Sequence, residues 1–381
     1  MRIGLLANSN TWLTPFYDAF AHDCDVWWAA YEHDVYKTLI SKYQNVIFVP
    51  HEKKVTSAAG NVYGYSHTGL TETRLDELVQ PDIWITDDAT RLAIMRKKTC
   101  MWVYAFHSFC YKRYVFHNSA LKYDLLLLPS EYFKAGFHRK IGFLPDDPRL
   151  AVTGFPKLDP VLSGRYSRSE VLSSYGICPT KKVVLYAPTW GGSSEVGSWG
   201  NELWCRWPKE IALKILERFL VEINRCGATT IIKLHSLAAL QDREAIRGIC
   251  VSNGAVMVDD SPALMADPLP LVAASDVLVS DMSGIITEFI AADKPVICIA
   301  PESEAAWHEA SIPAELLPSE PVNHLDDLLL GIRQALELGD KFEANRRRNV
   351  RATLFKYTDG NSAVRARDAI FDRYYNISKT F

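Results

Sequence analysis

The chain has 381 residues, of which 48% are hydrophobic and 23% charged, and its formal net charge is −3 at pH 7. This length favours two domains over one, and the small negative charge excludes a broad electrostatic grip on nucleic acid. The eight cysteines show no CxxC or CxH spacing, so neither a disulfide framework nor a zinc site is indicated. No metal ion or cofactor is predicted.

The sequence also restricts where the protein is expected to act. No stretch approaches the roughly 18 apolar residues of a membrane span. The apolar run after Met1 ends at Asn8, which is too short for a signal peptide. We expect a cytoplasmic protein in a reducing compartment, which would meet the inner face of the cell membrane only through its surface.

In the first half of the chain, short apolar strands alternate with helical stretches. This rhythm predicts a parallel, Rossmann-like sheet. The letters LLANSN stand at the first strand where a dinucleotide-binding chain would carry GxGxxG, so no dinucleotide site is expected there. The predicted strands are 3–7, 26–29, 46–49, 83–86, 101–106, 125–128 and 151–153.

The rhythm starts again after residues 154–160, a segment of Gly, Pro and polar residues that indicates the approach to a domain boundary. Strands are predicted at 183–187, 230–234, 256–258, 277–279 and 296–299, with helices at 211–223, 324–338, 341–355 and 362–375. We therefore predict an α/β protein of GT-B architecture, in which two Rossmann-like parallel-sheet domains face a cleft. The predicted parts are an acceptor-side domain at 1–160, a nucleotide-donor domain at 161–350, and a C-terminal helix at 351–381 that packs back on the first domain.

The turn that follows the strand 277–279 is a candidate phosphate site. In a parallel sheet, such a turn lies where a strand ends and a helix begins, and the free N–H groups and the helix dipole favour an anion there. The hydroxyls of Ser280 and Ser283, beside Asp281, suit a phosphate, and Gly284 allows close approach to the backbone. The alternative is that Ser283 only caps the following helix.

Two histidines, His107 and His235, each follow a predicted strand, one in each half of the chain. Catalytic residues of such sheets lie at the carboxyl ends of strands, and an imidazole can serve as a general base near neutral pH. Lys112 and Arg113 are placed to hold an anionic substrate, and Lys233 precedes the second histidine. The alternatives are two structural histidines and a solvated basic turn.

Two further segments allow more than one interpretation. The Gly-, Ser- and Trp-rich stretch 191–207, which follows Thr189 and Trp190, is too long for a simple connection and is typical of a lid or an acceptor site. Its tryptophans argue against a disordered insertion. A basic cluster near the C-terminus fits either anionic lipid headgroups or a solvated helix face; it comprises Arg346, Arg347, Arg348 and Arg351.

Six segments in chain order carry a resemblance to a known family. AFHSFCYKR is similar to His-Gly-Thr-x-x-Lys, VTGFPKLDPVL to Thr-Gly-x-Pro-Arg-x-Asp, and VLYAPTW to Tyr-Ala-Pro-Thr-Trp. IIKLHS is similar to Arg-x-His-Pro, SDVLVSDMSGIITEF to Asp-Tyr-Ser-Ser, and TDGNSAVRARDAIF to Asp-Gly-x-x-x-x-Arg. From about His107 onward, the chain resembles the CDP-glycerol glycerophosphotransferase family, whose members build teichoic acid and related polyol-phosphate polymers.

The resemblance implies a GT-B fold and transfer of a polyol phosphate, such as glycerol phosphate, from a CDP-polyol to an acceptor hydroxyl, with release of CMP. It implies that His107 is the base. The implied donor-side residues are His235, Thr189, Lys233, Ser280, Asp281, Ser283, Gly284 and Glu288. The implied residues on the acceptor side of the cleft are Lys112, Arg113, Gly154, Lys157 and Trp190.

Several positions depart from the family pattern. Ser108 and Gly284 stand where the family has Gly and Ser, and Lys233, Ser236 and Glu288 stand where it has Arg, Pro and Asp. These departures leave the polyol open, as well as the acceptor, which would be a lipid-linked or polymeric glycan. Two other functions also stay open: a GT-B glycosyltransferase or epimerase that uses a UDP- or CMP-sugar, and a non-catalytic GT-B binding module.

Overall fold

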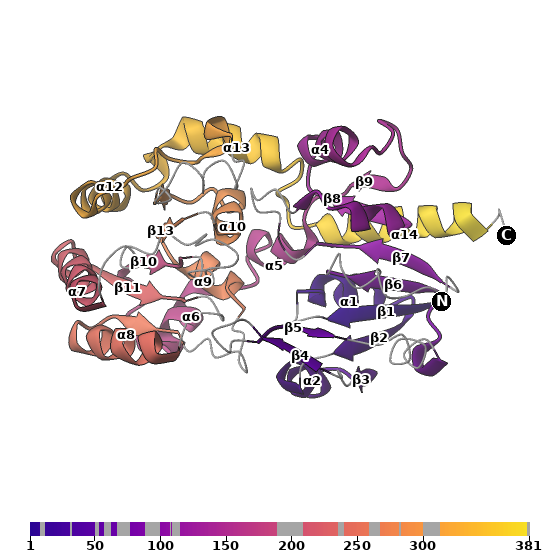
Figure 1. The fold of residues 1–381 in the computed structure, drawn as a ribbon, viewed down its shortest axis with the longest axis horizontal. Helices are drawn as coiled ribbons and strands as arrows, with labels where there is room; N and C mark the ends of the chain where they lie inside the picture. Colours follow the sequence, from indigo (N-terminus) through magenta and orange to yellow (C-terminus); the bar gives the residue numbers. More distant parts are fainter. Residues whose placement is uncertain are drawn as a thin grey trace.

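The computed structural model describes residues 1–7, 12–30, 33–49, 53–56, 62–66, 77–87, 100–106, 108, 115–188, 209–234, 240–258, 267–281, 283–299 and 313–378. Within these residues, two parallel sheets lie at the two ends of the molecule, with short helices between them (Figure 1). The predicted α/β class, with two parallel sheets and C-terminal helices, is confirmed.

The first sheet has the strand order β3-β2-β1-β6-β7-β8-β9 in the described part of the chain, and all its pairings are parallel. One face packs on α1 (Thr14–Phe20) and α14 (Ser362–Ser378), and the other packs on α4 (Glu131–Ile141). The strands are β1 (Arg2–Ala7), β2 (Asp25–Ala30), β3 (Val46–Phe48), β6 (Ile83–Thr86), β7 (Met101–Tyr104), β8 (Leu125–Leu128) and β9 (Leu150–Val152).

The second sheet has the strand order β12-β11-β10-β13-β14, again with parallel pairings throughout the described residues. Its strands are β10 (Lys182–Tyr186), β11 (Ala228–Ile232), β12 (Val256–Met257), β13 (Val277–Ser280) and β14 (Val296–Cys298). Helices α7 (Lys209–Arg225) and α12 (Leu325–Leu338) cover one face, and α9 (Leu269–Ala274) and α10 (Ile285–Ala291) cover the other. Helix α8 (Leu240–Ser252) follows β11.

Every predicted strand is present, with ends shifted by no more than two residues. The prediction missed a short antiparallel hairpin formed by β4 (Lys53–Thr56) and β5 (Val62–Ser66). The strand expected at 101–106 ends at Tyr104 because Phe106 has φ +54°, which takes the chain out of the extended conformation.

The chain between the sheets forms three short helices: η4 (Pro156–Leu158), α5 (Asp159–Leu162) and α6 (Arg168–Ser174). A single core of buried side chains runs through this region, from Phe137 under the first sheet, through Phe155 and Leu172, to Leu185 and Phe289 at the second. The two sheets therefore share buried apolar packing at their junction.

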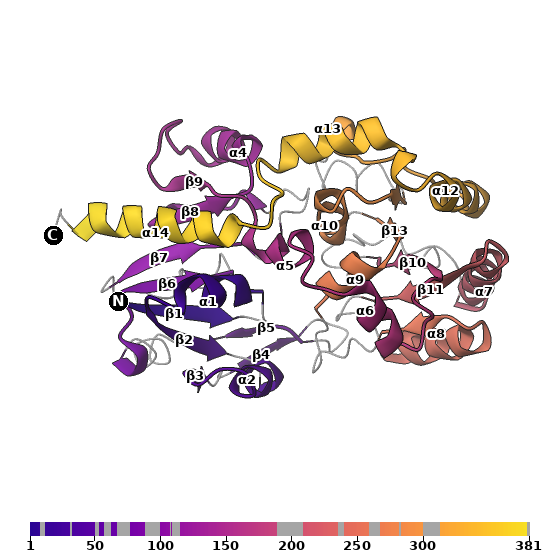
Figure 2. The ribbon, with the colours of Figure 1, turned by 180° about the vertical axis from the view of Figure 1, so that it is seen from behind.

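The C-terminal helix α14 returns to the first sheet, as Figure 2 shows, and its N-terminal end lies near α5. The carboxylate of Asp159 accepts hydrogen bonds from the backbone N–H groups of Ser362 (3.0 Å) and Ala363 (2.7 Å), which satisfies donors that a helix start leaves free. Burial raises the pKa of Asp159, and these two N–H groups oppose the rise. Gly154 has φ +91°, and a Cβ there would lie 2.4 Å from Oγ of Ser362, so only glycine fits beneath the helix start.

The basic cluster predicted at the C-terminus lies on α13 (Ala344–Leu354), which follows η5 (Ala314–Leu316) and η6 (Gly339–Lys341). Arg347 is fully buried: its Nε lies 2.8 Å from Oδ1 of Asp293, and its guanidinium also donates to the carbonyls of Asp340 and Phe342. Arg351 donates to the carbonyl of Ala291 at the end of α10. The cluster therefore fastens α13 to α10, and neither the lipid nor the solvated-face interpretation describes Arg347.

Arg347→Met should destabilise the protein by about 3 kcal/mol, because it leaves Asp293 and two buried carbonyls without their cation. Arg348→Met is the matched control, since Arg348 is 60% exposed and approaches the same Asp293 only to 3.7 Å. Arg348→Met should lower the free energy of unfolding by less than about 0.5 kcal/mol. Urea unfolding of both variants measures the difference. Equal midpoints for the two variants would contradict the structural role of Arg347.

Candidate functional site

The strand order of the second sheet predicts at which of its edges a ligand would bind. From β10 the chain passes to β11 and β12 on one side and then crosses to β13 and β14 on the other. The carboxyl ends of β10 and β13, paired through Tyr186 and Val279, therefore flank a topological switch point. Open parallel sheets bind ligands in the crevice at such a point.

Two of the predicted phosphate-site residues lie in this edge and are buried. Ser280 is the last residue of β13, and its hydroxyl donates to the carbonyl of Ala187, which follows β10, at 2.6 Å. Asp281 is 1% exposed. Because the hydroxyl proton of Ser280 is held by Ala187, this side chain joins the carboxyl ends of β13 and β10.

Ser283 and Gly284 lead directly into α10. The N-cap position is occupied by Gly284, with φ −58° and ψ −26°, and no side chain caps the helix there. Thr287 in the first turn donates its hydroxyl proton to the carbonyl of Gly284 at 2.6 Å. The alternative in which Ser283 caps α10 is therefore wrong. Because its φ is negative, the backbone at Gly284 does not require glycine, which is consistent with a close approach by a ligand.

A buried ion pair joins the segment between the sheets to α10. Nζ of Lys157 lies 2.5 Å from Oε1 of Glu288, and both side chains are 4% exposed. The ammonium also lies 3.9 Å from the ring centroid of Trp12, which precedes α1 in the first part of the chain. Oε2 of Glu288 is buried without a hydrogen-bond partner. Lys157 therefore links the first part of the chain to the first turn of α10.

A second acidic group lies near this pair. Asp267 accepts a hydrogen bond from the hydroxyl of Tyr166 (3.2 Å) and another from the N–H of Leu269 (3.0 Å). Burial raises the pKa of Asp267, whereas the N–H of Leu269 and the positive charges of Lys157 and Lys233 lower it. Burial and the carboxylate of Asp267 likewise raise the pKa of Tyr166. Lys233 follows β11, so its charge belongs to the carboxyl edge of the second sheet.

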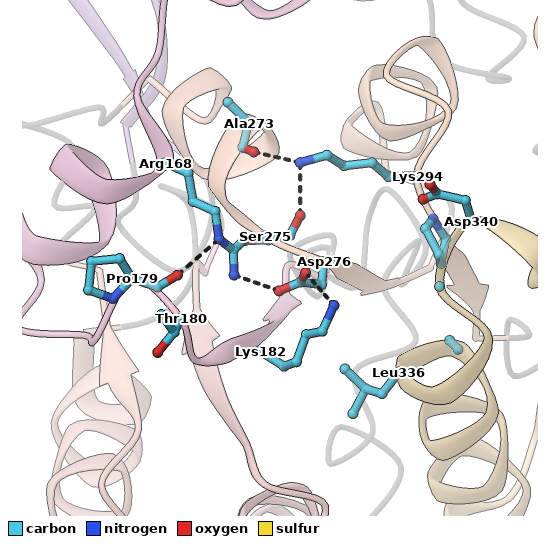
Figure 3. Close-up of a pocket in the computed structure, with 13 residues that line it drawn as sticks. Arg168, Pro179, Thr180, Lys182, Ala273, Ser275, Asp276, Lys294, Leu336 and Asp340 are labelled. Carbon is cyan, nitrogen blue, oxygen red and sulfur yellow. Dashed lines mark hydrogen bonds and ion pairs between the residues drawn. The ribbon is translucent and has the colours of Figure 1, made fainter.

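The opposite, amino edge of the second sheet has a depression of about 390 Å³ (Figure 3). The side chains of Lys294 and Arg168, which line it, already bind groups of the protein. Lys294 donates to the carbonyls of Val272, Ala273 and Ser275 at 2.5–2.9 Å, which caps the end of α9. Burial lowers the pKa of Lys294 to about 8. Arg168 is held by Asp276 and by nearby carbonyls. These contacts are structural, which leaves the carboxyl edge as the candidate site.

The structure does not place all the predicted site residues. His107, Lys112, Arg113, Thr189, Trp190 and His235 lie outside the described residues, so their roles stay predictions. In the sequence, residue 107 follows β7, residue 189 follows β10 and residue 235 follows β11.

Sequence reasoning missed the conformation that leads into residue 107. Phe106 combines φ +54° with 3% exposure, and its ring lies 3.7 Å from that of Tyr104 and 5.8 Å from that of Phe137. A bulky residue in the left-handed region stores strain, and such strain concentrates at functional sites. No sequence signal marks this conformation, because phenylalanine normally avoids it.

The CDP-glycerol:poly(glycerophosphate) glycerophosphotransferase family matches residues 35–372 of the chain. A search of curated proteins with the sequence of this chain found no match. None of the helices in the described ranges is long and apolar enough to cross a membrane.

Solved structures with the same fold include the wall teichoic acid polymerase TagF, at a TM-score of 0.65 and 15% identity over 98% of this chain and 89% of that one. A putative UDP-N-acetylglucosamine 2-epimerase from Listeria monocytogenes aligns at a TM-score of 0.61 and 13% identity over 98% and 97% of the two chains. UDP-GlcNAc 2-epimerase from Neisseria meningitidis aligns at a TM-score of 0.58 and 15% identity, over 98% of this chain and 100% of that one. These matches confirm the GT-B-like architecture, and the family match covers most of the sequence. The chain belongs to the CDP-glycerol:poly(glycerophosphate) glycerophosphotransferase family.

Proposed function

We propose that this protein transfers a polyol phosphate from a CDP-polyol, glycerol phosphate or a related group, to an acceptor hydroxyl of a cell-wall or capsule polymer. The observation that carries the proposal is the uncapped start of α10 at Ser283 and Gly284, beside the switch point of the second sheet. Backbone N–H groups at a helix start suit the pyrophosphate of such a donor. One TagF structure of the same fold is of a variant soaked with CDPG, which supports a donor of this kind.

In the proposed reaction, His107 removes the proton of the acceptor hydroxyl. The resulting oxygen attacks the phosphorus that carries the polyol, and the bond from this phosphorus to the oxygen of CMP breaks. CMP leaves with the electron pair, and a phosphodiester joins polyol and acceptor. His235, with Thr189 and Lys233, would hold the charge that develops on the leaving phosphate. Such a displacement needs positioning and charge stabilisation more than covalent catalysis.

We also propose the division of labour within the chain. Residues 1–160 would form the acceptor-side domain, residues 161–350 the donor domain, and residues 351–381 the returning helix. The first sheet lies within residues 2–152 and the second within 182–298, which supports the division near residue 160, and α14 packs on the first sheet, as the returning helix requires.

The epimerase bound to UDP-GlcNAc has the same fold, so a nucleotide-sugar reaction is the second candidate. A panel of CDP-glycerol, CDP-ribitol, UDP-GlcNAc and a CMP-sugar, with detection of released CMP or UDP, separates these functions. Release of CMP from a CDP-polyol supports the proposal. Turnover of a nucleotide sugar alone, or donor binding without turnover, replaces it with an epimerase, a glycosyltransferase or a binding module.

His107→Ala should lower kcat by about 10²–10⁴ with little change in donor affinity, because proton removal contributes only in the transition state. His235→Ala should weaken donor binding as well as turnover. Steady-state kinetics and calorimetry with CDP-glycerol measure both quantities. Full activity in both variants would remove the catalytic assignment.

Gly284→Val should weaken donor binding about 10-fold or more, because a branched side chain would occupy the space of the phosphate while the backbone angles remain allowed. Gly248→Val in α8 is the control, since nothing lies within 4 Å of a Cβ placed there. Calorimetry on both folded variants decides the matter. Unchanged donor affinity in Gly284→Val would leave this turn without a ligand role.

Lys157→Met should cost about 3–5 kcal/mol of folding free energy, because it leaves the buried carboxylate of Glu288 without its cation. The double variant Lys157→Met/Glu288→Met should recover most of that loss, since it removes both charges. Denaturant unfolding of Lys157→Met, Glu288→Met and the double variant gives the coupling energy between the two side chains. Additive losses would mean that the two side chains act independently.

A further inference from the structure

An exposed aromatic group lies on the first sheet, away from the residues discussed so far. His33 begins α2 (His33–Ile40), and its ring centroid lies 6.3 Å from that of Tyr36 and 5.6 Å from that of Phe48, the last residue of β3. The rings of Tyr36 and Phe48 are 5.5 Å apart. We call these three residues the aromatic platform. Phe48 is 38% exposed, His33 is exposed, and Tyr36 packs against the core and anchors the group.

The platform shares its edge of the sheet with the proposed catalytic histidine. The strand register aligns Phe48 of β3 with Ala30 of β2, and Ala30 with Ala7 of β1. The residue before Ala7, Leu6, is aligned with Thr86 of β6, which in turn is aligned with Tyr104 of β7. Residue 107 follows β7 in the sequence, so the platform and the end of the strand that leads to residue 107 lie at carboxyl ends of the same parallel sheet. Four strand spacings separate β3 from β7, or about 19 Å. Figure 1 places β3 and α2 at the lower border of this sheet.

The chemistry of the platform favours a neutral ligand. Among the described residues of α2, the two charges of Lys37 and Asp34 pair with each other, since Nζ of Lys37 lies 3.9 Å from Oδ1 of Asp34. Exposed aromatic rings that gather on a surface mark interaction sites, and their faces pack well against the C–H groups of a sugar ring. A polyol-phosphate chain would instead call for cations along its path.

We propose that His33, Tyr36 and Phe48 form an acceptor subsite that stacks against neutral sugar rings of the acceptor, several units from the hydroxyl that reacts. This inference rests on the proposed transferase function. It adds that the acceptor presents a run of sugar rings rather than a bare polyol-phosphate chain.

Saturation-transfer NMR with chitotriose, a neutral oligosaccharide, tests the subsite without any donor. We expect saturation transfer from the unaltered protein to chitotriose. The variant His33→Ala/Phe48→Ala should bind chitotriose with an affinity lower by about 10-fold. Ile40→Ser is the matched control: Ile40 is 48% exposed on the same helix, about 10 Å further along its axis, and should leave binding unchanged.

A glycerol phosphate oligomer is the second probe, and its binding should be the same in the double variant and the unaltered protein. No transfer to chitotriose, an equal loss in Ile40→Ser, or an equal loss for the glycerol phosphate oligomer would each overturn the subsite. CMP release from CDP-glycerol is measured separately. Sugar binding without CMP release from CDP-glycerol or CDP-ribitol would remove the transferase function and leave the platform as a sugar-binding site with no acceptor role.

Discussion

Between the two sheets, the segment at residues 154–162 is tied to α10 by the buried contact of Lys157 with Glu288, beside the apolar core that the sheets share. Removing two charges from water costs more than their attraction returns in many proteins, so such a pair is weak evidence for stability. It is better evidence for specificity, because Lys157 reaches the carboxylate of Glu288 only while α10 lies against this segment. Asp159, two residues later, holds the start of α14. Lys157 and Asp159 thus hold α10 and α14 to the same short segment.

The two edges of the second sheet show why the site lies where it does. At the amino edge, Lys294 and Arg168 are enclosed by carbonyls and by Asp276, so their charge stabilises the end of α9. At the carboxyl edge, α10 starts at Gly284 without a side-chain cap. A parallel sheet brings all helix starts to one edge, and their N–H groups make that edge attractive to an anion. The division between a structural edge and a binding edge therefore follows from the topology.

Much of the fold could be predicted because buried parallel strands consist of short runs of apolar residues, such as Leu125–Leu128. The β4–β5 hairpin was missed because Lys53–Thr56 and Val62–Ser66 contain no such run. The partners of Lys157 and Arg347 could not be predicted, since each depends on a tertiary contact with a residue far away in sequence, Glu288 or Asp293. Local pattern carries no information about such pairs, and an arginine-rich helix looks solvated until its packing is known.

The two halves of the molecule differ in the kind of ligand that their edges suit. The second sheet contributes helix-start N–H groups and the charge of Lys233, which match a pyrophosphate. The first contributes the aromatic platform, beside which charges cancel, and this matches sugar rings. An acceptor held at Phe48 has to extend across four strand spacings to reach residue 107, so its length would decide whether its terminal hydroxyl meets the base. Acceptor length would then be selected by the width of the sheet, a property that no single residue determines.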